Sequence, residues 1–139
     1  MMMEVIKKRV AELDFPADVK YHQEHTWARF TEDDAVVGIS DYAQDQLGDV
    51  IFVELPRVGE RFGLGQEFGV VESAKSVSTL YIPLAGIVTA VNVALDNSPE
   101  LINQEPYGAG WILRVKPDTR DAAGALLDPH SYKAMLEGK

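Results

Sequence analysis

The chain of 139 residues contains no cysteine. Disulfide bonds, thiolate metal sites and a cysteine nucleophile are therefore excluded. Any sulfur redox chemistry would have to come from an attached group rather than from the protein's own side chains.

Positive charge is also scarce, with 13 basic against 22 acidic residues and a formal net charge of −9. This balance argues against nucleic acid or an anionic membrane as a partner and suits docking onto basic protein surfaces. The apolar runs are too short to span a bilayer. Residues 1–19 lack the apolar core and cleavage site of a secretory signal, so we expect a cytoplasmic protein.

Three common kinds of site find no support in the sequence. The glycines of the loop 57–66 match neither phosphate-binding spacing. A serine–lysine nucleophile around Lys75 would need a buried lysine, whereas a hairpin tip is solvated. Metal-ligand spacing is missing among the histidines, although a site assembled by the fold stays open; the three are His22, His25 and His130.

The pattern that is present is mainly β. Segments 26–30, 35–40, 50–56, 67–74, 76–83, 86–95 and 111–117 read as strands, and 96–110 reads as irregular. Ser40 or Asp41 can cap a short helix over 41–49, and Asp128-Pro129 starts a C-terminal helix. Many short strands with small helices at both ends predict a β-sandwich or flattened β-barrel over residues 19–139, as one domain.

Residues 1–18 form a predicted helical extension. One helical face over residues 2–13 carries Met3, Ile6, Val10 and Leu13. Phe15-Pro16 ends this helix. It could pack on the domain as a cap or bind a partner.

Lys75 lies at the tip of the hairpin formed by residues 67–83. Its neighbours Ala74 and Ser76 are small, so a macromolecule could approach the ammonium group closely. The tip has none of the Asn, Gly or Asp residues that are usual in tight hairpin turns. The arms are apolar and β-rich and would present the tip rigidly. An ordinary surface lysine is the alternative, but these features favour a lysine that is acylated.

The segment "GQEFGVVESAKSVSTLYIPLAGIVTAVN" resembles the lipoyl-attachment segment of the glycine cleavage H-protein family. Glu72 lies three residues before Lys75, Gly65 ten before it and Gly86 eleven after it, as in that family. The resemblance runs from Val19 to the C-terminus. It includes "KYHQEHTWARF", "VGISDYAQDQLGDVIFVELPRVGE", "NSPELINQEPYGAGWILRVKP" and "LLDPHSYKAML".

The resemblance implies a lipoyl-type flattened barrel with lipoic acid bound in amide linkage to Lys75. It implies a carrier and not an enzyme, serving a pyridoxal-phosphate glycine decarboxylase, an aminomethyltransferase and a dihydrolipoyl dehydrogenase. A lipoate ligase or lipoyl transferase would modify the lysine, with recognition and presentation by Glu72, Ser73, Ala74, Ser76, Gly65 and Gly86. A cleft that stows the loaded arm would include Glu24, His25, Thr26 and Thr79.

Two departures bear on the cargo. Thr26 and Thr79 stand where the family usually has glutamate and aspartate, and both acids lie close to the stowed aminomethyl group. Threonine offers a neutral hydroxyl where a carboxylate would suit a protonated amine. A lipoyl carrier for sulfur oxidation of the heterodisulfide-reductase-like type is therefore a second hypothesis, and a lipoyl-relay protein is a third. A binding module without lipoate is the remaining alternative.

Overall fold

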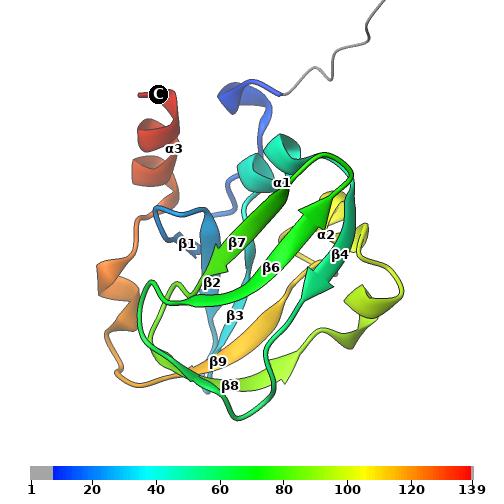
Figure 1. The fold of residues 1–139 in the computed structure, drawn as a ribbon. Helices are drawn as coiled ribbons and strands as arrows, with labels where there is room; N and C mark the ends of the chain where they lie inside the picture. The colour runs from blue at the N-terminus through cyan, green and yellow to red at the C-terminus, as the bar shows by residue number, and fades with distance from the viewer. Residues whose placement is uncertain (1–7, 139) are drawn as a thin grey trace, which may run out of the picture.

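The structure is a computed structural model that describes residues 8–138. The fold consists of two antiparallel β-sheets (Figure 1). The six-stranded sheet runs β1 (Lys20–Tyr21), β2 (Thr26–Phe30), β3 (Ala35–Ile39), β9 (Leu113–Pro117), β8 (Gly86–Val91) and β5 (Arg61–Phe62). The three-stranded sheet runs β4 (Val50–Glu54), β6 (Glu67–Ser73) and β7 (Val77–Tyr81). The predicted mainly β, flattened sandwich is confirmed.

The main core lies where apolar residues of the two sheets meet. Its fully buried side chains include Val37 and Val115 of the six-stranded sheet and Val71 of the three-stranded sheet. Burial of this apolar surface is the main stabilising contribution to such a fold.

A second core cluster is aromatic and holds the C-terminal helix α3 (Pro129–Glu137) against the six-stranded sheet. Tyr132 of α3 stacks on Tyr21 with ring centroids 4.1 Å apart. Trp27 lies beneath Gly38, where an added Cβ would be 2.6 Å from the indole. Gly38 is therefore needed for close packing rather than for a turn.

Two helices begin at the predicted caps. Ser40 accepts a hydrogen bond from the Ala43 N–H at the start of α1 (Asp41–Leu47), and Asp128 accepts one from the Ser131 N–H at the start of α3. Each cap satisfies an N–H group that has no partner inside the helix.

The predicted helix over residues 2–13 is wrong in its described part. Residues 8–13 contain only the 3₁₀ turn η1 (Val10–Glu12), and residues 2–7 lie outside the described residues. Leu13 takes an extended conformation and is buried, and the Asp14 N–H donates to the Asp41 carboxylate. Burial of Leu13 and the hydrogen bond of Asp14 stabilise an extended backbone at residue 13 in place of a helix.

The predicted strand 86–95 ends early, at Val91. Asn92 donates to the carbonyls of Ala109 and Trp111 and caps the 3₁₀ helix η2 (Val93–Asp96). The stretch predicted as irregular contains the four-residue helix α2 (Leu101–Gln104), and a further 3₁₀ helix, η3, covers Ala122–Ala125. Other predicted boundaries shift by one or two residues.

None of the helices within residues 8–138 combines the length and the apolar character needed to cross a membrane.

Candidate functional site

The turn Ser73–Ser76 joins β6 to β7 and carries Lys75. The Ser73 N–H donates to the Ser76 carbonyl at 2.8 Å. The buried Ser73 hydroxyl accepts from the N–H groups of Lys75 at 3.3 Å and Ser76 at 3.1 Å. The Ala74 N–H donates to the Asp49 carbonyl, which ties the turn to the start of β4. A serine hydroxyl that bonds local backbone groups fixes such a turn without glycine or asparagine.

The Lys75 side chain is exposed and lies over Gly48, at the end of α1. A Cβ added to Gly48 would lie 3.5 Å from Lys75 Cε and 4.0 Å from Nζ. Within residues 8–138, the salt bridges engage four arginines and leave Lys75 without a carboxylate partner. The ammonium group is thus presented on a fixed turn, and its acylation would break no salt bridge among the described residues.

A cleft of about 350 Å³ opens beside the turn, beginning at Ser76 and Val77. It runs between β7, an edge strand of its sheet, and helix α1. Its size is at the lower end of the range for small-ligand pockets, roughly 300–1,000 Å³. Its lining mixes apolar and polar side chains. Besides Ser76 and Val77, the lining residues are Glu24, His25, Ile39, Tyr42, Ala43, Gln46, Leu47, Val71, Ser78, Thr79 and Leu80.

His25 enters this cleft from a left-handed backbone conformation, with φ of 77°. Its Nδ1 lies 2.7 Å from the Tyr132 hydroxyl, which also lies 2.8 Å from the Ser40 hydroxyl. Burial raises the pKa of Tyr132 above its ordinary value, so this hydroxyl stays protonated. A positive φ outside glycine is uncommon and, where the surrounding contacts enforce it, points to a positioned side chain.

Comparison with known proteins shows the family. A model of the glycine cleavage H-protein family matches residues 19–139. The chain belongs to that family. It is 48% identical over 126 residues to the glycine cleavage system H protein of Bacteroides thetaiotaomicron, covering 91% of this chain and all of the relative. It is 52% identical over 130 residues to that of Mycobacterium avium, covering 88% of this chain and 97% of the relative.

A solved structure agrees with this assignment. The crystal structure of a glycine cleavage system H protein from Mycobacterium marinum superposes with a TM-score of 0.81 and 37% sequence identity. The match covers 90% of this chain and all of that chain.

The two H-protein positions where the resemblance predicts acids lie differently in the fold. Thr79 lines the cleft. Thr26 is buried, and its hydroxyl donates to the Tyr81 carbonyl at 2.8 Å, so it is not among the lining residues. Glu24 does line the cleft, and it supplies the only carboxylate among the described residues there. A negative charge is therefore present, but it comes from a different position.

The predicted recognition residues separate into two groups. Glu72 lies at the end of β6 beside the turn, together with Ser73, Ala74 and Ser76. Gly65 lies two residues before the other end of β6, where its N–H donates to the Ile82 carbonyl and its φ is 79°. Gly86 begins β8 in the other sheet, and a Cβ there would be 2.2 Å from the Lys116 carbonyl oxygen. The structure does not bring these two glycines to the tip, and backbone geometry alone accounts for them.

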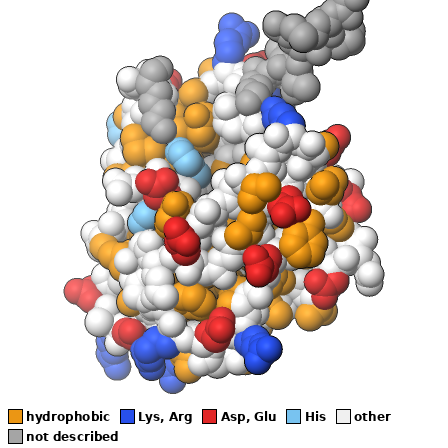
Figure 2. Space-filling view, in the orientation of Figure 1, with side chains coloured by type: hydrophobic (Ala, Val, Ile, Leu, Met, Phe, Trp, Pro, Cys, Tyr) orange, Lys and Arg blue, Asp and Glu red, His pale blue; other side chains and the backbone are white. Residues whose placement is uncertain are grey.

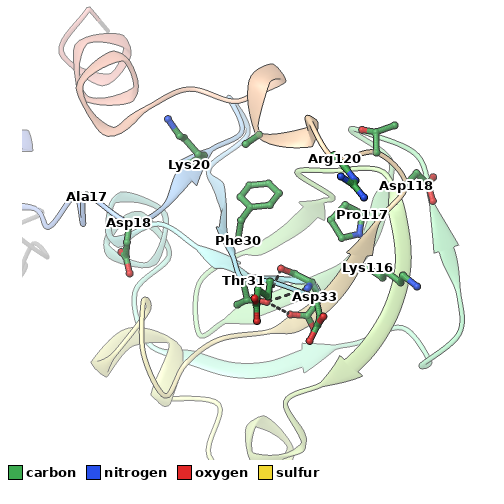
Figure 3. Close-up of a pocket in the computed structure, with 14 residues that line it drawn as sticks. Ala17, Asp18, Lys20, Phe30, Thr31, Asp33, Lys116, Pro117, Asp118 and Arg120 are labelled. Carbon is green, nitrogen blue, oxygen red and sulfur yellow. Dashed lines mark hydrogen bonds between the residues drawn. The ribbon is translucent and has the colours of Figure 1, made fainter.

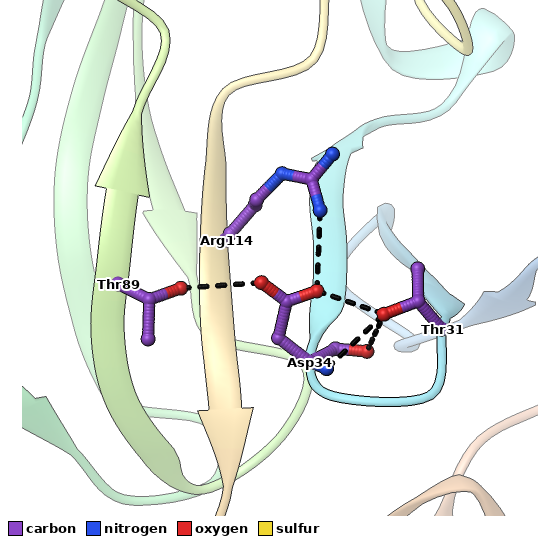
Figure 4. A network of polar contacts seen from close by, with 4 residues as sticks. All are labelled: Thr31, Asp34, Thr89 and Arg114. Atoms are coloured by element: carbon purple, nitrogen blue, oxygen red, sulfur yellow. Dashed lines mark hydrogen bonds and ion pairs between the residues drawn. The ribbon is translucent and has the colours of Figure 1, made fainter.

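A larger cavity of about 750 Å³ lies at the β2–β3 turn, away from the hairpin 67–81, none of whose residues line it (Figure 3). Asp34 of that turn is held by Arg114 of β9 at 3.2 Å, by Thr31 at 2.9 Å and by Thr89 of β8 at 3.3 Å (Figure 4). This network fastens the turn to the sheet and gives the carboxylate a structural role.

Three residues near Lys75 and the cleft were not predicted from the sequence as site residues: Gly48, Tyr42 and Gln46. The last two lie one helical turn apart on α1 and face the cleft. The i, i+4 spacing of Tyr42 and Gln46 could have placed them on one helix face, but not opposite β7.

Proposed function

We propose that this chain is the lipoyl carrier of a glycine cleavage system, with lipoic acid bound through an amide bond to Nζ of Lys75. The observation that carries the proposal is the position of Lys75, exposed on a turn fixed by the Ser73 hydroxyl and adjacent in sequence to Ser76, which lines a cleft. When bound, lipoic acid would supply a disulfide that accepts the aminomethyl group on one sulfur; removal of that group leaves a dithiol, and oxidation of the dithiol restores the disulfide.

The residues around Lys75 suit such an arm. The Gly48 surface leaves room beside the lysine stem. Ile39, Leu47 and Leu80 give the cleft an apolar lining for a hydrocarbon chain. Glu24 offers a carboxylate to a protonated amine, as a charge-assisted hydrogen bond would require. Thr79 offers a neutral hydroxyl, and His25 also lines the cleft.

The partners follow from this role. A pyridoxal-phosphate glycine decarboxylase would load the carrier, an aminomethyltransferase would unload it, and a dihydrolipoyl dehydrogenase would reoxidise it. The chain itself would be a non-catalytic subunit working in the cytoplasm. Its benefit is effective concentration, because a tethered group visits several active sites without diffusing away.

A lipoate ligase or lipoyl transferase would first modify Lys75. Glu72, Ser73, Ala74 and Ser76 are at hand for its recognition, since all four lie within three residues of the lysine. Gly65 and Gly86 would contribute away from the tip. Gly65 allows a positive φ before β6, and Gly86 allows the close approach of the Lys116 carbonyl to β8.

A sulfur carrier on the same lipoyl arm is the second candidate. The observation in its favour is that Thr26 and Thr79 bring no charge to the cleft, and a sulfur cargo needs none. Glu24 in the cleft and the names of the relatives favour the aminomethyl cargo.

Reconstitution with a glycine decarboxylase tests the proposed function. The lipoylated protein should support exchange between glycine carboxyl and bicarbonate, and Lys75→Arg should not. No exchange with several decarboxylases, together with activity in a sulfur-oxidising system, would reverse the choice. Transfer of the lipoyl group from Lys75 to another acceptor protein would instead support the relay hypothesis.

A further inference from the structure

The outer face of the three-stranded sheet carries an apolar and acidic row next to Lys75. Phe52 of β4 pairs with Glu72 of β6, and Glu72 pairs with Val77 of β7. Neighbouring residues of a strand point to opposite faces. Because Val71 and Ser73 are buried in the core, Glu72 and its two partners stand on the outer face.

The apolar members of this row are unusually exposed. Phe52 is 51% exposed and Val77 is 65% exposed, and Ile51, left unpaired by a bulge in β4, is 58% exposed. Three of the six large exposed hydrophobic residues of the described chain thus fall on this one sheet, while Val58, Leu64 and Val93 are scattered over loops and η2. Grouped exposed apolar side chains mark interaction surfaces, whereas single ones do not.

The charge on this sheet has one sign. Its three strands contain Glu54, Glu67 and Glu72 and no lysine or arginine. Figure 2 shows hydrophobic and acidic side chains interspersed over the face that carries β4, β6 and β7. A complementary protein surface would have an apolar centre with lysine or arginine around it.

Position selects among the possible partners. An enzyme that acylates Lys75 must bring its active site to Nζ, because the arm does not yet exist. Enzymes that act on the finished arm can dock farther away, since the arm supplies the reach. Glu72 and Val77 lie three and two residues from Lys75, so an enzyme that reaches Nζ is brought close to this row.

We propose that the outer face of the three-stranded sheet, with Phe52, Glu54, Glu72 and Val77, binds the enzyme that acylates Lys75, through a basic-rimmed apolar surface of that enzyme. This inference rests on the proposed lipoylation of Lys75. It assigns the apolar flank, Phe52 and Val77, a part in recognition beyond the residues of the turn.

Acylation rates test the apolar contact. Purified chain is incubated with lipoate ligase, lipoate and ATP, and initial rates over a range of chain concentrations are followed by intact mass. Phe52→Ser should lower kcat/KM about tenfold, the scale of a central interface side chain, and leave kcat nearly unchanged. Val93→Ser removes a residue that is 70% exposed elsewhere and should react like the wild type.

Reversing the charge of one acidic residue tests the docking surface independently. Glu54→Lys, on the outer face of β4, should lower kcat/KM about threefold to tenfold and weaken its dependence on salt. Glu32→Lys changes the net charge equally at the β2–β3 turn and should have no effect. Thermal unfolding of every variant confirms that rates refer to folded protein.

The outcomes separate the two proposals. Wild-type rates for both Phe52→Ser and Glu54→Lys would overturn the docking surface and leave lipoylation intact. A wild-type chain that is not acylated at all would overturn the proposed function, and this inference with it. Normal acylation combined with slower reoxidation by dihydrolipoyl dehydrogenase would assign the face to that partner and overturn the proposal.

Discussion

Gly48 lies directly beneath the side chain of Lys75. A Cβ added at Gly48 would be only 3.5 Å from Lys75 Cε. Its backbone has φ of 79° and ψ of −162°, a conformation open essentially to glycine alone. One residue thus ends helix α1 and leaves space beside the lysine.

Replacing Gly48 with alanine should lower the free energy of unfolding by about 1–3 kcal/mol, because the new Cβ is strained at this φ. The rate of acylation should fall less than the stability, since contact at 3.5 Å lets the lysine stem shift. Urea denaturation measures the stability change. Gly124→Ala is the matched control, because its Cβ would meet open space, and it should be nearly neutral. Equal losses for the two variants would contradict this account of Gly48.

Ser73→Ala should loosen the turn that presents Lys75. The substitution removes the acceptor of the Lys75 and Ser76 N–H groups and should cost about 1–2 kcal/mol. Hydrogen exchange should be faster at those two amides, and acylation should be slower. Ser76→Ala removes only the hydroxyl that lies 3.3 Å from the Ser73 hydroxyl and leaves the backbone bonds in place, so exchange at these two amides should stay close to that of the wild type. Unchanged exchange at residue 75 in Ser73→Ala would show that the hydroxyl does not fix the turn.

Glu24→Gln should reduce loading with the aminomethyl group about two- to fivefold, because an exposed ion pair contributes at most about 1 kcal/mol. Thr79→Asp should raise loading, since it places a second carboxylate in the cleft. Loading is measured as the mass of the adduct after incubation with glycine and decarboxylase. Glu100→Gln, an exposed acid outside the cleft, serves as the control. If neither cleft variant differs from the wild type, the cargo carries no amine that the cleft recognises.

Asp128 should make the stability of α3 depend on pH. A hydrogen bond from the Ser131 N–H holds the pKa of this carboxyl below its ordinary value. The depressed pKa means that its contribution is fully present above about pH 4 and is lost as pH falls through the lower folded-state value. Asp128→Asn keeps a capping oxygen and should flatten this limb of the stability curve, whereas Asp128→Ala should be less stable at neutral pH as well. Denaturation midpoints from pH 2 to 7 provide the measurement, and parallel curves for Asn and wild type would contradict the assignment.

The hairpin, its lysine and the two capped helices could be predicted because their determinants are local. The strand 26–30 forms with the predicted bounds, directly before the acidic turn 32–34, and Asp128-Pro129 is a helix-start signal that needs no distant contact. The family resemblance added lipoate as the group expected on Lys75, and the positions of Gly65 and Gly86.

The predictions from sequence were wrong or incomplete where contacts between residues far apart in the chain determine the backbone conformation. Asn92 ends β8 because the carbonyls of Ala109 and Trp111 capture its side chain, and nothing near residue 92 in the sequence announces that. Leu13 leaves helical geometry to enter the core. Of the residues expected in the cleft, Glu24, His25 and Thr79 line it, whereas Thr26 is buried and does not. The wall on α1 depends on how a helix packs beside an edge strand.

The mass of the modified chain tests the central claim most directly. Protein produced in a host with lipoate and an active ligase, analysed intact and after proteolysis, should carry one lipoyl group, on the peptide that contains Lys75. Lys75→Arg should carry none. An unmodified wild type, or a lipoyl group found on any other lysine, would contradict the account.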